Sequence, residues 1–219
     1  MDFAEIVVTG RVATDMSSIT ESTVSSDEAL LRLKAGNERF VAGTAKFPTV
    51  QKEILADLAK GQHPYATILS CSDSRVPPEL VFDAGFGDLF IVRVAGNILS
   101  PEVAASLQYA GRHLRTPLFV VLGHTNCGAV AAAIDTQLHG TRQLSRIQIL
   151  VDSILPGLTD LDTQLTPEAM LAQAVEANVR WSMRQILETP EGREREAEDR
   201  LKLVGAIYEI ETGRVRFLE

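Results

Sequence analysis

The sequence predicts an α/β protein with a mostly parallel central sheet flanked by helices, an antiparallel hairpin at the C-terminal edge, and helices at the N-terminal end. Three short apolar runs, at residues 65–70, 89–94 and 118–122, support the sheet. They lack the alternation of polar and apolar residues that marks a half-exposed strand, so they are typical of parallel strands buried on both faces. Helical segments between them indicate right-handed crossover connections.

Two helices are expected before the first strand. Ser25 and Glu28 stand in capping-box register ahead of a periodic apolar stretch, which predicts a helix ending near Gly43. A shorter helix is expected around residues 51–60, with Gly61 as its stop signal.

Further helices are expected around and after the third strand. Residues 101–114 and 126–138 are two of them. Thr166 followed by Pro167 marks the start of another, because threonine caps a helix and proline fits its first turn. The stretch 191–200 mixes charges of both signs and is interpreted as a solvated face or loop.

The chain ends on two strand-like segments, 203–209 and 214–218, joined around a Thr-Gly pair. This pattern predicts the hairpin that completes the sheet. Residues 1–25 are rich in Ser and Thr in their second half and lack periodicity, so we expect a flexible arm there. Residues 26–219 would then form a single domain, because no linker divides them.

Composition excludes several classes of partner. The net charge of −8 argues against nucleic acid, since phosphate binding needs clustered Lys and Arg. No apolar run approaches the roughly 18 residues of a membrane span, and no signal-peptide pattern opens the chain. A cytoplasmic location is therefore expected, where two cysteines are more often free thiols than a disulfide.

Reactive residues follow two of the predicted strands. Cys71 and Asp73 come directly after the first, and His124 and Cys127 come after the third. If these strands are neighbours, the four side chains meet at one edge of the sheet. Two thiolates, an imidazole and a carboxylate suit Zn²⁺. A buried cysteine beside a catalytic Cys–His pair is the alternative that these residues leave open.

Three motifs resemble those of the β-class carbonic anhydrases. They are Cys71-Ser-Asp73-Ser-Arg75-Val-Pro-Pro-Glu79, Val92-Arg93-Val-Ala-Gly96-Asn97 and Gly123-His124-Thr-Asn-Cys127-Gly128. Gly36-Asn37 with Phe40, Gly205-Ala-Ile-Tyr208 and Thr212-Gly213 also fit that family's pattern. The similarity runs in order over residues 29–218, which is nearly the whole chain.

The resemblance implies one Zn²⁺ per chain, bound by Cys71, His124 and Cys127. Asp73 would be a fourth ligand in a closed form. In an open form Arg75 would draw Asp73 away, and water would take the free position. The implied activity is the zinc-dependent, reversible hydration of carbon dioxide to bicarbonate and a proton through zinc-bound hydroxide.

The resemblance also assigns a substrate pocket. Gln62 falls where the family places a donor to a bicarbonate oxygen, and Phe90 and Tyr109 fall at pocket positions, although both would equally suit an ordinary core. Ala95 occupies a position that is often Val. Ile68 replaces a Trp that helps a regulated subgroup bind bicarbonate away from the metal, so we expect no such site and an open resting state.

The resemblance implies self-association, as a dimer at least and commonly a tetramer, because the family's pocket is completed across a subunit interface. Two alternatives concern the reaction. The same chemistry could act on carbonyl sulfide or carbon disulfide, or a closed zinc site could be purely structural within a binding or sensor module. Asp73, Arg75 and Gln62 argue against the second alternative, since a structural site needs none of them.

Overall fold

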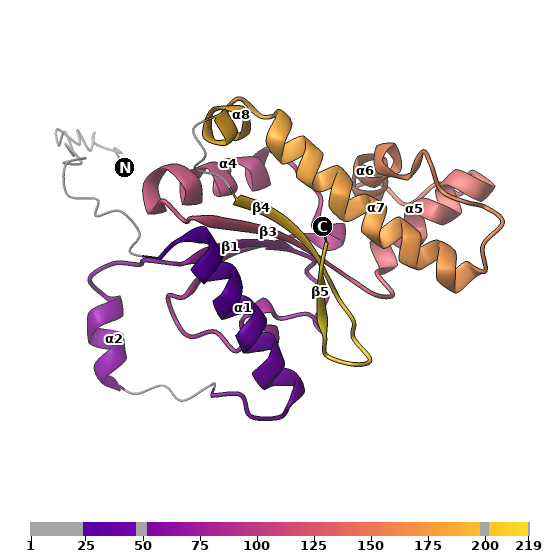
Figure 1. Ribbon diagram of the computed structural model, residues 1–219. Coiled ribbons are helices and arrows are strands. Elements are labelled where there is room, and N and C mark those ends of the chain that lie inside the picture. Colours follow the sequence, from indigo (N-terminus) through magenta and orange to yellow (C-terminus); the bar gives the residue numbers. More distant parts are fainter. Residues whose placement is uncertain (1–23, 47–51, 198–201, 219) are drawn as a thin grey trace, which may run out of the picture.

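A five-stranded sheet forms the centre of the protein (Figure 1). This computed structural model describes residues 24–46, 52–197 and 202–218. The strands are β1 (Ala66–Ser70), β2 (Leu89–Arg93), β3 (Leu118–His124), β4 (Lys202–Tyr208) and β5 (Val215–Phe217). Their order is β2-β1-β3-β4-β5, with every neighbouring pair parallel except β4 and β5. The predicted fold class, including the antiparallel C-terminal hairpin, is confirmed.

The central strands are buried on both faces, as their continuous apolar sequences predict. Every residue of β1 and β3 is buried. β2 differs, because four of its five residues are only partly buried and Arg93 is exposed. Among the described residues, β2 lies at the edge of the sheet and pairs with one strand, β1.

Helices cover both faces of the sheet (Figure 1). On one side lie α1 (Ser26–Val41), α2 (Lys52–Leu58) and α3 (Pro78–Val81). On the other lie α4 (Pro101–Tyr109), α5 (Gly128–His139), α6 (Ile147–Ile154), α7 (Pro167–Glu188) and α8 (Pro190–Ala197). Each face of the sheet has its own apolar core. The sequence interpretation did not include α3 or α6.

The helix starts follow the predicted capping chemistry. Ser25 Oγ accepts a hydrogen bond from the Glu28 backbone N–H at 3.1 Å, which caps α1. Thr166 Oγ1 accepts one from the Ala169 N–H at 3.3 Å, which caps α7. Gly43 follows the end of α1 with φ +68°, as expected of a helix stop. The predicted second helix is present from Lys52 to Leu58, and its expected first residue lies outside the described residues.

Two helices differ from their predicted ranges. The helix expected over 101–114 is α4 followed by a π-turn at residues 110–114, which ends in a left-handed Arg115. The helix expected from 126 begins two residues later, since Cys127 is extended and caps α5.

The interpretation of residues 191–200 as a solvated face or loop is wrong in part. Most of the segment belongs to α8, and Thr189 Oγ1 accepts a hydrogen bond from the Gly192 N–H at 3.0 Å. Arg195 donates to the backbone carbonyl oxygens of Gly111 and Thr116, so its side chain is partly buried. The Thr-Pro-Glu sequence that starts at Thr189 repeats the signature at the start of α7, and this signal predicts a helix.

The division into an arm and a domain stays a prediction. Residues 1–23 of the expected arm lie outside the described residues, and Ser25 already caps α1. In the three described ranges, no helix combines the length and apolar character needed to cross a membrane.

Two glycines allow α7 to lie close to the sheet. A Cβ added to Gly123 in β3 would be 2.6 Å from Val179 Cγ2, and one added to Gly205 in β4 would be 3.1 Å from Val179 Cγ1. Such distances are shorter than van der Waals contact, so larger residues would push α7 outward. The close approach brings α7 next to the carboxyl end of β3.

Asn37 links α1 to the C-terminal hairpin. Its Nδ2 donates to the carbonyl oxygens of Val81 at 3.1 Å and Gly213 at 2.8 Å. Its Oδ1 accepts from the Val215 N–H at 2.8 Å. The preceding Gly36 has no room for a side chain, because a Cβ would lie 1.8 Å from the Phe82 carbonyl oxygen.

We expect Asn37→Ala to lower the free energy of unfolding by about 2–4 kcal/mol, because three buried or partly buried backbone groups lose their partner. Urea denaturation would measure the change. Glu38→Ala is the matched control on the same helix, where the side chain is exposed and little change is expected. Equal stability of the two variants would contradict the role of Asn37.

Candidate metal centre

The site forms where two parallel strands end side by side. β1 pairs with β3 in a register that places Ser70 opposite Leu122. Cys71 directly follows β1, and His124 is the last residue of β3. The sequence expectation that these strands are neighbours is therefore confirmed.

A tight turn brings Cys127 back toward His124. Asn126 adopts a left-handed conformation with φ +58°, which asparagine tolerates better than most residues. The Thr125 N–H donates to the Tyr208 carbonyl oxygen at 3.0 Å, so the turn is tied to β4. Cys127 then caps α5, and its sulfur lies at the positive end of that helix. This is the helix-start position predicted for the His-x-x-Cys sequence.

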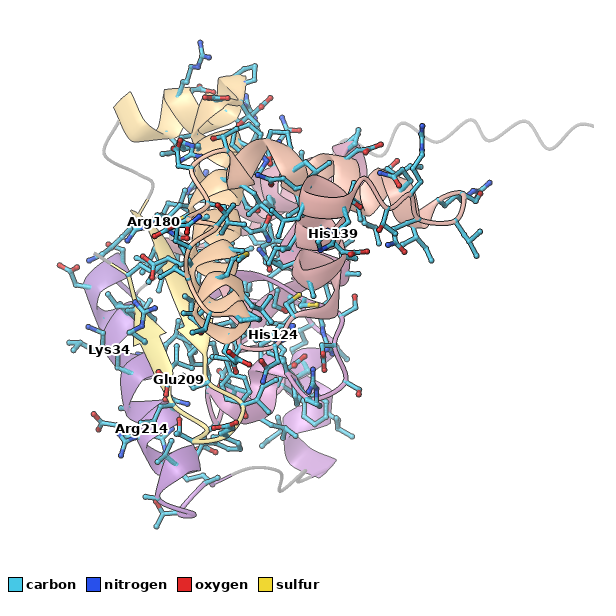
Figure 2. All side chains as sticks on the ribbon, turned by 90° about the vertical axis from the view of Figure 1, so that its right-hand side faces the viewer. Lys34, His124, His139, Arg180, Glu209 and Arg214 are labelled. Carbon is cyan, nitrogen blue, oxygen red and sulfur yellow. The ribbon has the colours of Figure 1, made fainter. Side chains whose placement is uncertain are left out.

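Cys71, His124 and Cys127 form one buried cluster. Their potential ligand atoms, two Sγ and one imidazole nitrogen, all lie within 4.8 Å of one another. Figure 2 shows His124 inside the molecule, where its side chain is fully buried. Two sulfurs and a nitrogen in a closely spaced, buried group are a donor set suited to zinc.

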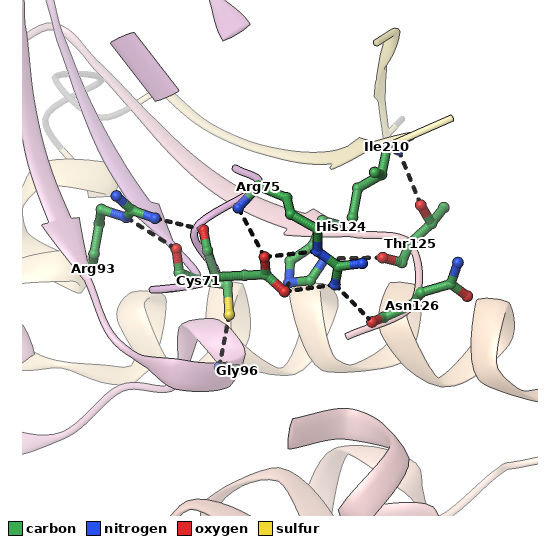
Figure 3. Close-up of polar contacts among 9 residues, drawn as sticks. Cys71, Arg75, Arg93, Gly96, His124, Thr125, Asn126 and Ile210 are labelled. Atoms are coloured by element: carbon green, nitrogen blue, oxygen red, sulfur yellow. Dashed lines mark hydrogen bonds and ion pairs between the residues drawn. The ribbon is translucent and has the colours of Figure 1, made fainter. Parts of the chain in front are cut away.

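The hydrogen bonding of His124 leaves one ring nitrogen directed at the cluster. Nδ1 lies 2.9 Å from the Thr125 carbonyl oxygen, which can only accept, so Nδ1 carries the proton (Figure 3). In the neutral ring Nε2 then holds a lone pair. Nε2 is buried and has no hydrogen-bond partner among the described residues. A metal ion would supply the partner that this atom lacks.

The two sulfurs titrate as a pair. A hydrogen bond from Cys127 lowers the pKa of the Cys71 thiol to about 4, against the effect of burial, and the Gly96 N–H lowers it further. The same hydrogen bond to Cys71, together with burial, raises the pKa of Cys127. One thiolate and one thiol therefore share a proton. A divalent cation that replaces this proton would satisfy both sulfurs.

Asp73 is paired with Arg75 at the rim of the cluster. Arg75 Nε donates to Oδ1 at 2.9 Å and Nη2 donates to Oδ2 at 2.7 Å, which is a bidentate ion pair (Figure 3). These hydrogen bonds hold the pKa of Asp73 well below its usual range. Asp73 Oδ2 lies 3.9 Å from His124 Nε2, so the carboxylate is near the cluster. The predicted Asp73–Arg75 contact is present.

Arg93 is a neighbour of the site to which the sequence analysis assigned no role. Its Nε donates to the Cys71 carbonyl oxygen at 3.1 Å and its Nη2 to the Asp73 carbonyl oxygen at 2.7 Å. Arg93 thus holds the backbone that carries both side chains. The sequence signal for this role is a charged residue at the end of an apolar strand, three residues before Gly96.

The predicted pocket residues differ in exposure and come from separate segments of the chain. Phe90 and Tyr109 lie together, with ring centroids 6.2 Å apart, and Tyr109 is 47% exposed. Ala95 is half-buried in the turn beside Gly96. Gln62 lies in the loop before β1 and is exposed. Their roles in binding a substrate stay predictions.

Ile68 is fully buried in β1 and belongs to the apolar core on the α1 side of the sheet. Cys71 belongs to the core on the opposite side.

A family model described as carbonic anhydrase matches residues 66–215. Carbonic anhydrase 2 of Mycobacterium tuberculosis is 45% identical over 126 residues, which are 58% of this chain and 61% of that protein. The chain thus spans less than two thirds of this relative. A carbonic anhydrase of Pseudomonas aeruginosa is 30% identical over 175 residues, covering 77% of this chain and 80% of that protein.

Solved structures show the same architecture. A tetrameric β-carbonic anhydrase of Sordaria macrospora superposes with a TM-score of 0.70 at 27% identity, covering 77% of this chain and 87% of that chain. A β-carbonic anhydrase of Aspergillus fumigatus gives a TM-score of 0.70 at 29% identity, covering 84% and 88%.

We expect the purified protein to contain one zinc per chain, and His124→Ala to lose most of it, because the substitution removes the buried Nε2. Metal analysis by mass spectrometry would measure both. His139→Ala is the matched control, since His139 is exposed at the end of α5 and outside the cluster. Full zinc content in His124→Ala would exclude this residue as a ligand.

Proposed function

Because this chain belongs to the carbonic anhydrase family and to its β class, we propose that it catalyses the reversible hydration of carbon dioxide to bicarbonate and a proton. The observation that most supports this proposal is the cluster of Cys71, His124 and Cys127 beside an Asp73 that is paired with Arg75. A catalytic zinc site has three protein ligands and an open fourth position. Here three ligands are available, and Arg75 holds Asp73, the possible fourth.

Cys71, His124 and Cys127 would hold the zinc. When bound there, zinc would lower the pKa of a water molecule far enough to supply a nucleophile near neutral pH. The chain's own contribution is to keep the fourth position accessible. The bidentate pair does this, because a carboxylate held by two guanidinium hydrogen bonds is less available as a ligand.

Asp73 would also orient the attacking water. Its depressed pKa keeps it an ionised carboxylate through the neutral range, so it can only accept hydrogen bonds. A water that donates to Asp73 presents its oxygen lone pair away from the carboxylate. We propose that this lone pair faces the carbon of the substrate.

Carbon dioxide carries no charge, so an apolar wall suits it. We propose that Phe90, Tyr109 and Ala95 supply this wall and that Gln62 donates to bicarbonate. We further propose that the chain self-associates as a dimer or tetramer. The relative from Sordaria macrospora, which is tetrameric, is consistent with such an assembly.

We expect Arg75→Ala to reduce kcat/KM for carbon dioxide hydration about 10- to 100-fold while zinc is retained, because Asp73 is then free to occupy the fourth position. Stopped-flow hydration assays and metal analysis would be made on the same samples. Arg75→Lys should lose less activity, since one charged donor still pairs with Asp73. Unchanged activity of Arg75→Ala would contradict the proposed role of the pair.

Activity should rise as pH increases from 6.5 to 9.5, because the nucleophile is a deprotonated water. Two thiolate ligands donate more charge than two imidazoles, so the midpoint should lie somewhat above the value of about 7 typical of three histidines. Asp73 should not add a step to the activity profile between pH 6.5 and 9.5, because its pKa is lowered and it is already ionised there.

The same titration tests the interpretation of Ile68. Without a regulatory bicarbonate site, the profile of kcat/KM should fit a single proton and should not become steeper when bicarbonate is added. A transition of more than one proton that bicarbonate deepens would show the interpretation of Ile68 to be wrong. A flat profile would exclude a deprotonated water as the nucleophile.

A further inference from the structure

A backbone N–H reaches the sulfur of one cluster residue. The Gly96 nitrogen lies 3.3 Å from Cys71 Sγ, and the contact is buried (Figure 3). Gly96 has φ +71°, a conformation that favours glycine. A Cβ at this position would lie 2.8 Å from Ile154 Cδ1 and 3.1 Å from Ala129 Cβ. The donor therefore depends on one particular backbone turn, at residues 95–97.

Two side chains of α7 hold that turn. Asn178 Nδ2 donates to the Gly96 carbonyl oxygen at 2.8 Å, and Ser182 Oγ donates to the Asn97 carbonyl oxygen at 2.9 Å. The two residues are four apart on one helix, so they share a face. The Asn97 N–H donates to the Val94 carbonyl oxygen at 3.0 Å. The peptide between Gly96 and Asn97 is thus held on both sides.

These polar side chains are buried where apolar ones would suffice for packing. Asn178 is 1% exposed and Ser182 is not exposed at all. Burying an amide or a hydroxyl is unfavourable unless it forms hydrogen bonds, and the Asn178 amide N–H and the Ser182 hydroxyl both donate to the turn. Neighbouring positions on α7, such as Val175 and Val179, pack against the sheet with apolar side chains. The polar pair is therefore specific to the turn.

We infer that Asn178 and Ser182 are positioning residues of the metal centre, which act by directing the Gly96 N–H at Cys71 Sγ. The inference rests on the zinc site of the proposed function. A hydrogen bond to a ligating sulfur fixes its orientation and withdraws electron density from it, as hydrogen bonds to sulfur do in iron–sulfur proteins. Loss of the bond leaves a sulfur that is less well placed and more easily oxidised.

The test compares Asn178→Leu and Ser182→Ala with the unaltered protein. Asn178→Leu keeps a similar volume without a donor, and Ser182→Ala removes only a hydroxyl. Zinc release to a colorimetric chelator should show an affinity about 10- to 100-fold lower in Asn178→Leu, with a smaller loss in Ser182→Ala. In the cobalt-substituted proteins, the sulfur-to-cobalt charge-transfer band should move to lower energy.

Ile186→Ala is the matched control, because Ile186 is buried on the same helix two turns beyond Asn178. It should lower the melting temperature without changing zinc affinity or the cobalt band. Ser182→Thr, which keeps the hydroxyl, should restore both properties relative to Ser182→Ala. If Asn178→Leu does not fold, the comparison of Ser182→Thr with Ser182→Ala tests the role of α7.

The outcomes separate the two proposals. An unaltered protein that binds no zinc would overturn the proposed function. An unaltered protein that binds zinc, with Asn178→Leu and Ser182→Ala matching Ile186→Ala in affinity and cobalt spectrum, would overturn the role of α7 alone.

Discussion

The parallel pairing of β1 with β3 is the constraint on which the rest of the site depends. Cys71 and His124 are 53 residues apart in sequence, and they meet because the two strands run in the same direction and end at the same edge. Parallel pairing requires a crossover, and the crossover buries both strands between helix layers. The cluster is therefore formed inside the molecule, where sulfur and imidazole ligands are shielded from water.

Because the cluster is buried, negative charge on its sulfurs is unfavourable unless a proton or a cation balances it. Two buried cysteines that lie this close cannot both be thiolates without a cation, so the pKa of the Cys71 thiol is lowered while that of Cys127 is raised. Asp73 faces the same cluster, and its charge is balanced by Arg75 at the solvent-exposed rim. The site thus separates a buried cluster of possible metal ligands from a polar rim. Such a division is suited to a small uncharged substrate with a polar product.

Support for the cluster comes from several elements. The turn after β3 is tied to β4, Arg93 holds the backbone of Cys71 and Asp73, and α7 holds the turn whose N–H contacts Cys71 Sγ. Gly123 and Gly205 let α7 approach closely enough for this last contact. Residues distant in sequence therefore hold the backbone segments that surround the cluster.

The sequence by itself determined the fold class, the strand positions and the starts of α1 and α7, because apolar runs and capping residues are short-range signals. It placed Cys71, His124 and Cys127 after strands, and the family resemblance implied that they bind one metal. Their meeting depends on the pairing of β1 with β3. The mixed charges of residues 191–200 did not indicate α8, although the Thr-Pro-Glu sequence at its start is typical of a helix beginning. Only the tertiary structure decided the partners of Arg93, Asn178 and Ser182. Their hydrogen bonds end on backbone atoms of remote segments, and neither residue type nor spacing encodes such an acceptor.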